Sequence, residues 1–126
     1  MALGSCPDLT ATPVEKTYVL LMVADITRAL RFYTEAFDVT VVISSPHWSE
    51  FTVAGTTIAL HPGGSGDQTR TGLGFEVEDL DAAIQRATEV GGRISAPQRE
   101  RSKARIRVAE LIDTEGNLIT VAEVKG

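Results

Sequence analysis

The side chains that could do chemistry in this chain are few, and they stand far apart. The 126 residues include two histidines, one tryptophan and one cysteine. Trp48 offers a flat surface and one N–H donor, which suits stacking on a planar ligand, although packing against a loop or a partner subunit would use the same surface. The charge of His61 can change near neutral pH, which suits either a ligand contact or a structural hydrogen bond. Cys6, being alone, excludes an internal disulfide and a metal site with several cysteines.

Charge and hydropathy narrow the classes of partner. The net charge of -5 comes from mixed signs, so we expect no nucleic-acid partner. One local basic run either forms a solvated loop and strand edge or contacts an anionic ligand: Arg99, Arg101, Lys103, Arg105 and Arg107. No apolar stretch reaches the roughly 18 residues of a membrane span, and the N-terminus lacks the charged and apolar regions of a signal peptide. We therefore expect a cytoplasmic protein with no membrane partner.

The elements that must position these side chains occur twice. Residues 23–30 (VADITRAL) recur 54 positions later as residues 77–84 (VEDLDAAI), and each copy reads as a strand, an aspartate and a helix. Ala54-Gly55 returns 61 positions later as Glu115-Gly116. A short duplicated unit must stack on its twin, and the seam between the twins is where a ligand can bind.

Periodicity divides each copy into a strand, a helix and three strands. In the first copy Asp25 is placed to cap a helix with one apolar stripe, and Ala54-Gly55 reads as a tight hairpin turn. Its strands are expected at residues 17–23, 39–44, 48–53 and 56–61. In the second copy, Gly91-Gly92 ends the helix. After it we expect a weak strand at 93–95, a polar loop at 96–103, and strands at 105–112 and 118–124.

These elements predict one compact unit, because 126 residues with 43% hydrophobic content can build a single core. Residues 1–14 read as a flexible N-terminal arm. Residues 15–126 form one domain, made of modules at about 15–62 and 71–125 and a Gly- and Ser-rich linker at 63–70.

Two motifs carry a family resemblance: RALRFY at residues 28–33 and DTEGN at residues 113–117. With the two modules, they resemble the vicinal oxygen chelate superfamily, which holds glyoxalase I, extradiol dioxygenases, fosfomycin-resistance enzymes and bleomycin-binding proteins. The resemblance covers residues 18–124, although Thr114 replaces a usual proline and Asp38 a usual glycine. It implies an α+β fold in which two tandem βαβββ modules form a curled mixed sheet, an open barrel with its helices on the outer face.

The resemblance also implies where a metal would bind. Enzymatic relatives hold a divalent ion with one ligand from the first and one from the last strand of each module. Carried over, and checked against the two internal offsets, these positions hold Tyr18, Ala59, Gly72 and Thr120. Alanine and glycine have no donor atom, neutral threonine is a poor one, and one tyrosine cannot retain a catalytic divalent ion. We expect no metal and no other cofactor; the disfavoured alternative is a divalent metal, with a register slip of two that turns His61 inward as well and with Glu76 or Glu110 contributing.

The same comparison adds two candidate contacts. A substrate-contacting tyrosine of the fosfomycin-resistance relatives falls on Glu110, which otherwise reads as an exposed strand residue paired with an arginine. His61 follows Leu60 as in the leucine-histidine pair of bleomycin-binding relatives. The expected ligand-binding set is Tyr18, Trp48, Ala59, His61, Gly72, Glu110 and Thr120, with Glu110 and His61 as weak catalytic candidates.

Three functions remain open on the sequence. The first is a metal-free cavity for a small, partly aromatic molecule, as in the bleomycin-resistance branch. The second is an enzyme of the superfamily, a lyase, isomerase or dioxygenase, either metal-dependent or using Glu110 or His61 as general base. The third is a non-catalytic dimeric interaction module. A homodimer is expected in each case, because open sheet edges in relatives are often completed by a second chain.

Overall fold

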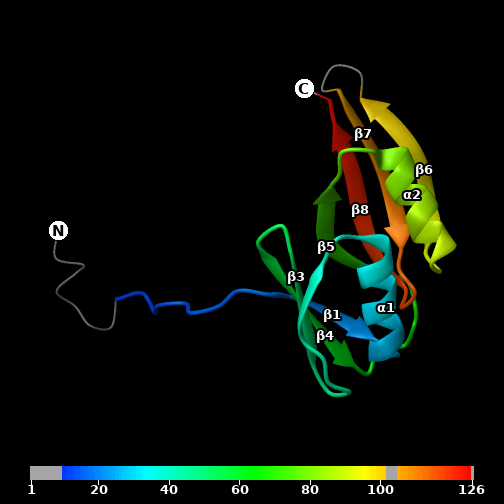
Figure 1. Cartoon of the computed structure of the whole chain (residues 1–126). Helices are drawn as coiled ribbons and strands as arrows, with labels where there is room; N and C mark the ends of the chain where they lie inside the picture. Colours follow the sequence, from blue (N-terminus) through cyan, green and yellow to red (C-terminus); the bar gives the residue numbers. More distant parts are fainter. Residues whose placement is uncertain (1–9, 102–104, 126) are drawn as a thin grey trace, which may run out of the picture.

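Two modules of the same topology make up the fold (Figure 1). The computed structural model describes residues 10–101 and 105–125; for residues 96–101 it describes the backbone only. The first module contains β1 (Val19–Val23), α1 (Ile26–Ala36), β2 (Thr40–Ile43), β3 (Ser49–Val53) and β4 (Thr56–Pro62). The second contains β5 (Thr69–Glu76), α2 (Leu80–Glu89), β6 (Arg93–Arg101), β7 (Ile106–Ile112) and β8 (Asn117–Val124).

Each module has its own four-stranded sheet, in the orders β1-β4-β3-β2 and β5-β8-β7-β6. The first and last strands of a module pair in parallel, and the other pairs are antiparallel. The sheets of the described residues do not close into a barrel, so β1 and β5 are both edge strands. The expected α+β fold of two βαβββ modules is confirmed.

Capping aspartates and an apolar stripe explain both helices. The Asp25 carboxylate accepts a hydrogen bond from the Arg28 amide, and the Asp79 carboxylate does the same for Ala82, at 3.0 Å each. These bonds satisfy amides that lack a partner at a helix N-terminus. The stripe of α1 is buried against the first sheet and consists of Ile26, Ala29, Phe32 and Tyr33.

A two-residue turn fixes the register of the first sheet. Ala54 and Gly55 have φ values of 47° and 83°, the left-handed conformation at both positions that a tight hairpin requires. Val53 therefore pairs with Thr56, and three residues farther along the ladder Glu50 lies opposite Ala59. This register decides which side chains share a face with Ala59.

The second sheet is larger than the sequence predicts. The expected loop at 96–103 is wrong for its first part, because β6 continues to Arg101 and pairs Arg99 with Val108 and Arg101 with Ile106. Pairing with β7 supplies hydrogen bonds to the backbone of these polar residues. The strand therefore forms here although the sequence shows no hydrophobic alternation. Similarly, β5 begins at Thr69, inside the expected linker, because Thr69 and Arg70 pair with β8.

In the basic run, Lys103 and the side chains of Arg99 and Arg101 lie outside the described residues. The Arg107 guanidinium lies 2.9 Å from the Asp81 carboxylate.

Residues 11–18 form neither helix nor strand and are exposed. In Figure 1 this segment, which we call the arm, leads away from the first sheet. Among the described residues, no helix has the length and apolar character needed to cross a membrane.

A turn of the second module, residues 113–117, binds the first module. Tyr33 of α1 donates a buried 2.5 Å hydrogen bond to the Asp113 carboxylate, and the amide group of Asn117 donates to the carbonyl of Met22 at 3.0 Å. Burial, together with the Asp113 charge, raises the pKa of the Tyr33 hydroxyl well above its usual value. Asp113 also accepts from two amides of its own turn.

Glu115 of the same turn caps the other module's helix. Its carboxylate accepts from the amides of Ala24 and Asp25 at 3.0 and 2.9 Å, and from the Arg28 guanidinium at 2.8 and 3.1 Å. Burial opposes ionisation of Glu115, but the hydrogen bonds from Arg28, Thr114 and Asp25 outweigh it and hold the pKa of that carboxyl below its usual value. The ionised form therefore stabilises the pairing of the modules.

We expect Glu115→Gln to lower the free energy of unfolding by about 1–3 kcal/mol at pH 7, the usual cost of weakening buried hydrogen bonds to a charge. Because the folded pKa is depressed, this difference is full above the ordinary value of 4.5 and shrinks as the pH falls below it. Urea unfolding at pH 7 and at a pH below that ordinary value measures the difference in the free energy of unfolding.

Glu35→Gln is the control, since Glu35 lies 3.9 Å from Arg31 on the exposed side of α1 and should change stability by less than about 0.5 kcal/mol. If Glu115→Gln and Glu35→Gln lowered the free energy of unfolding equally, the role of Glu115 in pairing the modules would be contradicted.

Candidate ligand-binding site

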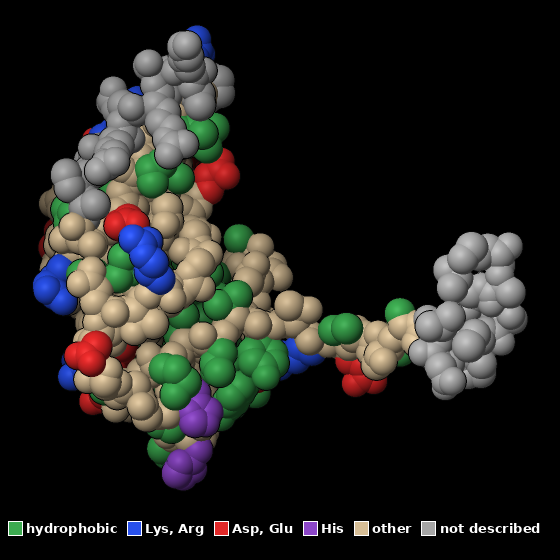
Figure 2. Space-filling view, turned by 180° about the vertical axis from the view of Figure 1, so that it is seen from behind, with side chains coloured by type: hydrophobic (Ala, Val, Ile, Leu, Met, Phe, Trp, Pro, Cys, Tyr) green, Lys and Arg blue, Asp and Glu red, His purple; other side chains and the backbone are tan. Residues whose placement is uncertain are grey.

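The first sheet has one face covered by α1 and one open face. On β1, Leu21 and Val23 are buried in the core, whereas Leu20 and Met22 alternate with them and are 45% and 42% exposed; Tyr18, just before the strand, continues this alternation and is 47% exposed. Figure 2 shows hydrophobic side chains gathered beside the histidines, close to where the arm leaves the body. Large apolar side chains exposed together on one sheet face mark a surface that binds something.

Three aromatic rings surround Ala59 on this open face. The register puts Leu20 and Glu50 on either side of Ala59, which is fully buried but lies outside the core cluster under the helices. Tyr18 and Trp48 meet edge to face with ring centroids 5.6 Å apart, and Trp48 meets His61 in the same way at 6.1 Å. We call the rings of Tyr18, Trp48 and His61 around Ala59 the aromatic face.

A buried carboxylate lies within the aromatic face. Glu50 is 5% exposed; its Oε2 accepts from Trp48 Nε1 and its Oε1 from Lys16 Nζ, at 2.6 Å each. These hydrogen bonds, that of Lys16 first, hold the pKa of Glu50 below its usual value. Neither Glu50 nor Lys16 was predicted from the sequence. Glu50 could have been found, because the two-residue turn at 54–55 places it opposite Ala59; Lys16, on the arm, gives no such signal.

His61 is held by its neighbour's backbone. Its Nδ1 lies 2.6 Å from the carbonyl oxygen of Pro62. A carbonyl only accepts hydrogen bonds, so Nδ1 carries the proton and Nε2 of the neutral ring is left as an acceptor. His61 can therefore accept a hydrogen bond from a ligand at Nε2.

On the open face of the second sheet, none of the predicted site residues has an aromatic ring. Gly72 and Thr120 lie on it, and Glu110 pairs with Thr120 across β7 and β8. The Glu110 carboxylate lies 3.5 Å from the Arg70 guanidinium, as in the alternative interpretation of a strand residue paired with an arginine. A shallow pocket of about 260 Å³ forms beside this pair.

The predicted site residues thus form two groups. Tyr18, Trp48, Ala59 and His61 come together on the first sheet, and Gly72, Glu110 and Thr120 on the second. No strand pairing joins the two sheets within the described residues. The four positions carried over for a metal are therefore split into two pairs on different sheets.

These four positions do not fit a divalent metal. Ala59 and Gly72 have no donor atom, and Tyr18 and Thr120 offer only neutral hydroxyl groups. In the described part of the chain, no three His, Cys, Asp or Glu side chains lie close enough together to hold a metal ion. The carboxylates opposite two of these positions are engaged: Glu50 by Trp48 and Lys16, and Glu110 by Arg70.

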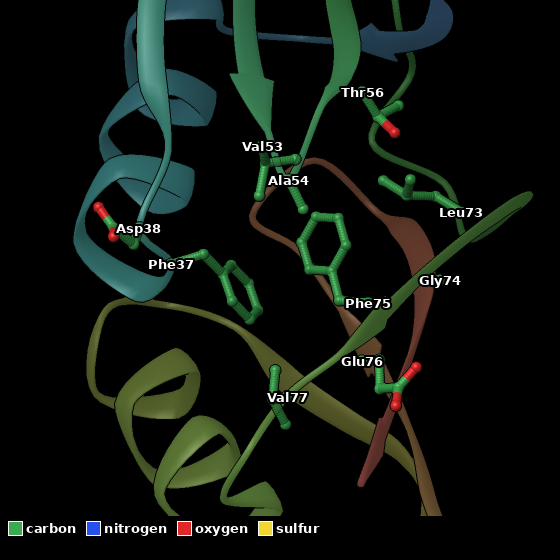
Figure 3. A pocket seen from close by; sticks show the side chains of 10 residues that line it. All are labelled: Phe37, Asp38, Val53, Ala54, Thr56, Leu73, Gly74, Phe75, Glu76 and Val77. Atoms are coloured by element: carbon green, nitrogen blue, oxygen red, sulfur yellow. The ribbon is translucent and has the colours of Figure 1, made fainter. Parts of the chain in front are cut away.

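A separate apolar pocket of about 390 Å³ lies between the modules, lined among others by Phe37, Val53, Leu73, Phe75 and Val77. The rings of Phe37 and Phe75 meet inside it with centroids 4.8 Å apart (Figure 3). The carboxylates on its lining point away from these rings in the figure. The pocket contains none of the predicted site residues, and it lacks the converging polar groups that orient a ligand.

The comparisons with known proteins agree with this architecture. The sequence pattern of the family described as Glyoxalase/Bleomycin resistance protein/Dioxygenase superfamily matches residues 17–121. No curated protein matches the chain.

Several solved structures share the fold. The fosfomycin resistance protein FosX from Listeria monocytogenes is 20% identical with a TM-score of 0.75, over 90% of this chain and 96% of FosX. A glyoxalase/bleomycin resistance protein/dioxygenase family enzyme from Burkholderia phytofirmans PsJN is 21% identical with a TM-score of 0.71, over 86% of this chain and 97% of that one. One structure of FosX is complexed with Mn(II) and sulfate. At these identities the likeness is one of fold alone.

The contact of His61 with Pro62 predicts its tautomer. We expect neutral His61 to carry its proton on Nδ1, whereas free histidine favours Nε2, because the Pro62 carbonyl accepts from Nδ1. Long-range ¹H–¹⁵N NMR spectra distinguish the two forms, and His47→Ala assigns the signals because the chain has two histidines. A neutral ring with its proton on Nε2 would contradict the assignment of Nε2 as the hydrogen-bond acceptor.

Proposed function

The chain belongs to the Glyoxalase/Bleomycin resistance protein/Dioxygenase superfamily, and we propose that it is a metal-free protein that binds a small, partly aromatic molecule. The observation that carries this proposal is the aromatic face, where Tyr18, Trp48 and His61 surround Ala59. Rings held edge to face leave surfaces on which a planar ligand can stack. Trp48 is held in place by its bond to Glu50, so little freedom is lost on binding.

The donor set supports binding without a metal. At the four positions where a metal would be held, two residues lack a donor and the others are neutral hydroxyls. The two candidate acid–base groups lie on different sheets, His61 on the first and Glu110 on the second. This separation favours binding over catalysis within one chain.

We also propose that a second copy of the chain covers the aromatic face. Two features support a homodimer: the unpaired edges of β1 and β5, and the exposure of Leu20 and Met22 beside Tyr18. The partner's second sheet, with its Gly72 and Thr120 positions, would supply the opposite wall of the cavity. A ligand would then lie between the aromatic face and the partner's second sheet.

Calorimetric titration with planar bicyclic compounds tests the binding proposal. We expect at least one to bind, and Tyr18→Ala to weaken that binding roughly 3- to 10-fold, the range expected for one aromatic contact. Val41→Ala is the control: Val41 is 40% exposed like Tyr18, but it pairs with the buried Phe51 and shares that residue's face of the sheet. Binding unaffected by Tyr18→Ala, or stoichiometric metal in the purified protein, would overturn the proposal.

Sedimentation velocity at micromolar concentration tests the dimer. We expect a dimer that Leu20→Asp converts largely to monomer, because the charge would be buried without a partner at the interface. Val41→Asp places the same charge on the other face of the sheet and should leave the dimer intact. A monomeric wild-type protein would reject this part of the proposal.

A further inference from the structure

The Glu50 carboxylate is a buried charge on the face that would bind the ligand. It is almost fully covered, and Lys16 is its one cationic partner among the described residues. A carboxylate in such a place needs a cation or several hydrogen-bond donors to remain ionised. Whatever occupies the space beside Glu50 must therefore satisfy this negative charge.

Lys16 fills that space from outside the sheet. It lies on the arm, three residues before β1 begins, and its side chain is 52% exposed. Within the described residues, Glu50 is the one group that Lys16 binds through a hydrogen bond or ion pair. An ion pair made by a half-exposed lysine is weak, because water replaces its partner easily.

The second module contains a corresponding pair whose cation lies on a strand, with the Arg70 side chain 82% exposed. Arg70 stands 54 positions after Lys16 and binds Glu110, and Glu110 lies opposite Thr120 as Glu50 lies opposite Ala59. Arg70, however, belongs to β5 and pairs with Leu118. The first module thus differs in having its cation on an unpaired segment and an aromatic ring, that of Trp48, bound to the carboxylate.

We propose that the site takes a cationic ligand, an ammonium or amidinium group on a planar apolar body, and that Lys16 is a tethered occupant which this ligand displaces. The inference rests on the proposed function and specifies its ligand class. The cation would bind Glu50 while the rings of Tyr18 and Trp48 contact its body, an arrangement that favours cations over neutral molecules. An anionic ligand would meet Glu50 directly and be repelled.

Three matched probes test the charge preference: 2-naphthylmethylammonium, 2-naphthylmethanol and 2-naphthoate, titrated calorimetrically into the whole protein. We expect the cation to bind at least about tenfold more tightly than the alcohol, and the carboxylate to bind most weakly. Equal or tighter binding of the alcohol or the carboxylate would overturn the inference but leave the proposed function standing. If no probe binds, both fail.

Two variants test the roles of the pair. Glu50→Gln should remove the preference for the cation over the alcohol, while Lys16→Ala should strengthen binding of the cation severalfold by removing its competitor. Lys125→Ala is the control, because Lys125 is also a half-exposed lysine, 3.6 Å from Glu123, and it should leave all affinities unchanged. If Lys16→Ala weakens binding of the cation, Lys16 is not a competitor. Should Glu50→Gln fail to fold, the probe series and Lys16→Ala still decide the question.

Discussion

The pairing of the two modules depends on the hydrogen bonds that residues 113–117 make to the first module. No strand pairing joins the two sheets in the described chain, so their relative position must be fixed by side chains and by the packing of the helices. Tyr33 and Asp113 form a fully buried contact, and Glu115 satisfies the backbone at the start of α1. A buried polar contact of this kind tolerates little displacement, because a lost partner leaves a desolvated charge.

The geometry of the turn itself explains its glycine. Gly116 has a φ of 88°, and a β-carbon there would lie within 2.5 Å of the backbone oxygens of Gly66 and Asp67. The linker between the modules therefore passes directly over the turn. This close approach brings linker, turn and first module together at one point.

The same turn helps to position the candidate site. Asn117 binds the carbonyl of Met22, and Glu115 binds the amides that follow β1. These bonds fix the end of β1, whose other residues include Leu20 and Met22 on the open face. The strand that supports the aromatic face is thus held by the module that does not contain it.

Local patterns in the sequence were sufficient to predict the elements of each module, but not the contacts between residues far apart in the chain. The capping aspartates, the apolar stripe of α1 and the turn at 54–55 depend on neighbouring residues, and all were predicted. The extension of β6 and the Lys16–Glu50 pair depend on partners elsewhere in the chain. Lys16 and Glu50 are 34 positions apart, and the arm has no period that would orient a side chain. Only the fold brings them together.

Comparison of the two modules shows which face of a sheet is free to change. Residues that face the helices are apolar in both copies: Leu21 and Phe75, Val23 and Val77, Ile58 and Ile119, Leu60 and Val121. Residues of the open face differ in chemistry: Tyr18 and Gly72, Leu20 and Gly74, Met22 and Glu76, Ala59 and Thr120. Core packing constrains the first set, because a change of volume there is costly. The open face lacks that constraint, so a symmetric frame can carry an aromatic surface in one module and different side chains in the other.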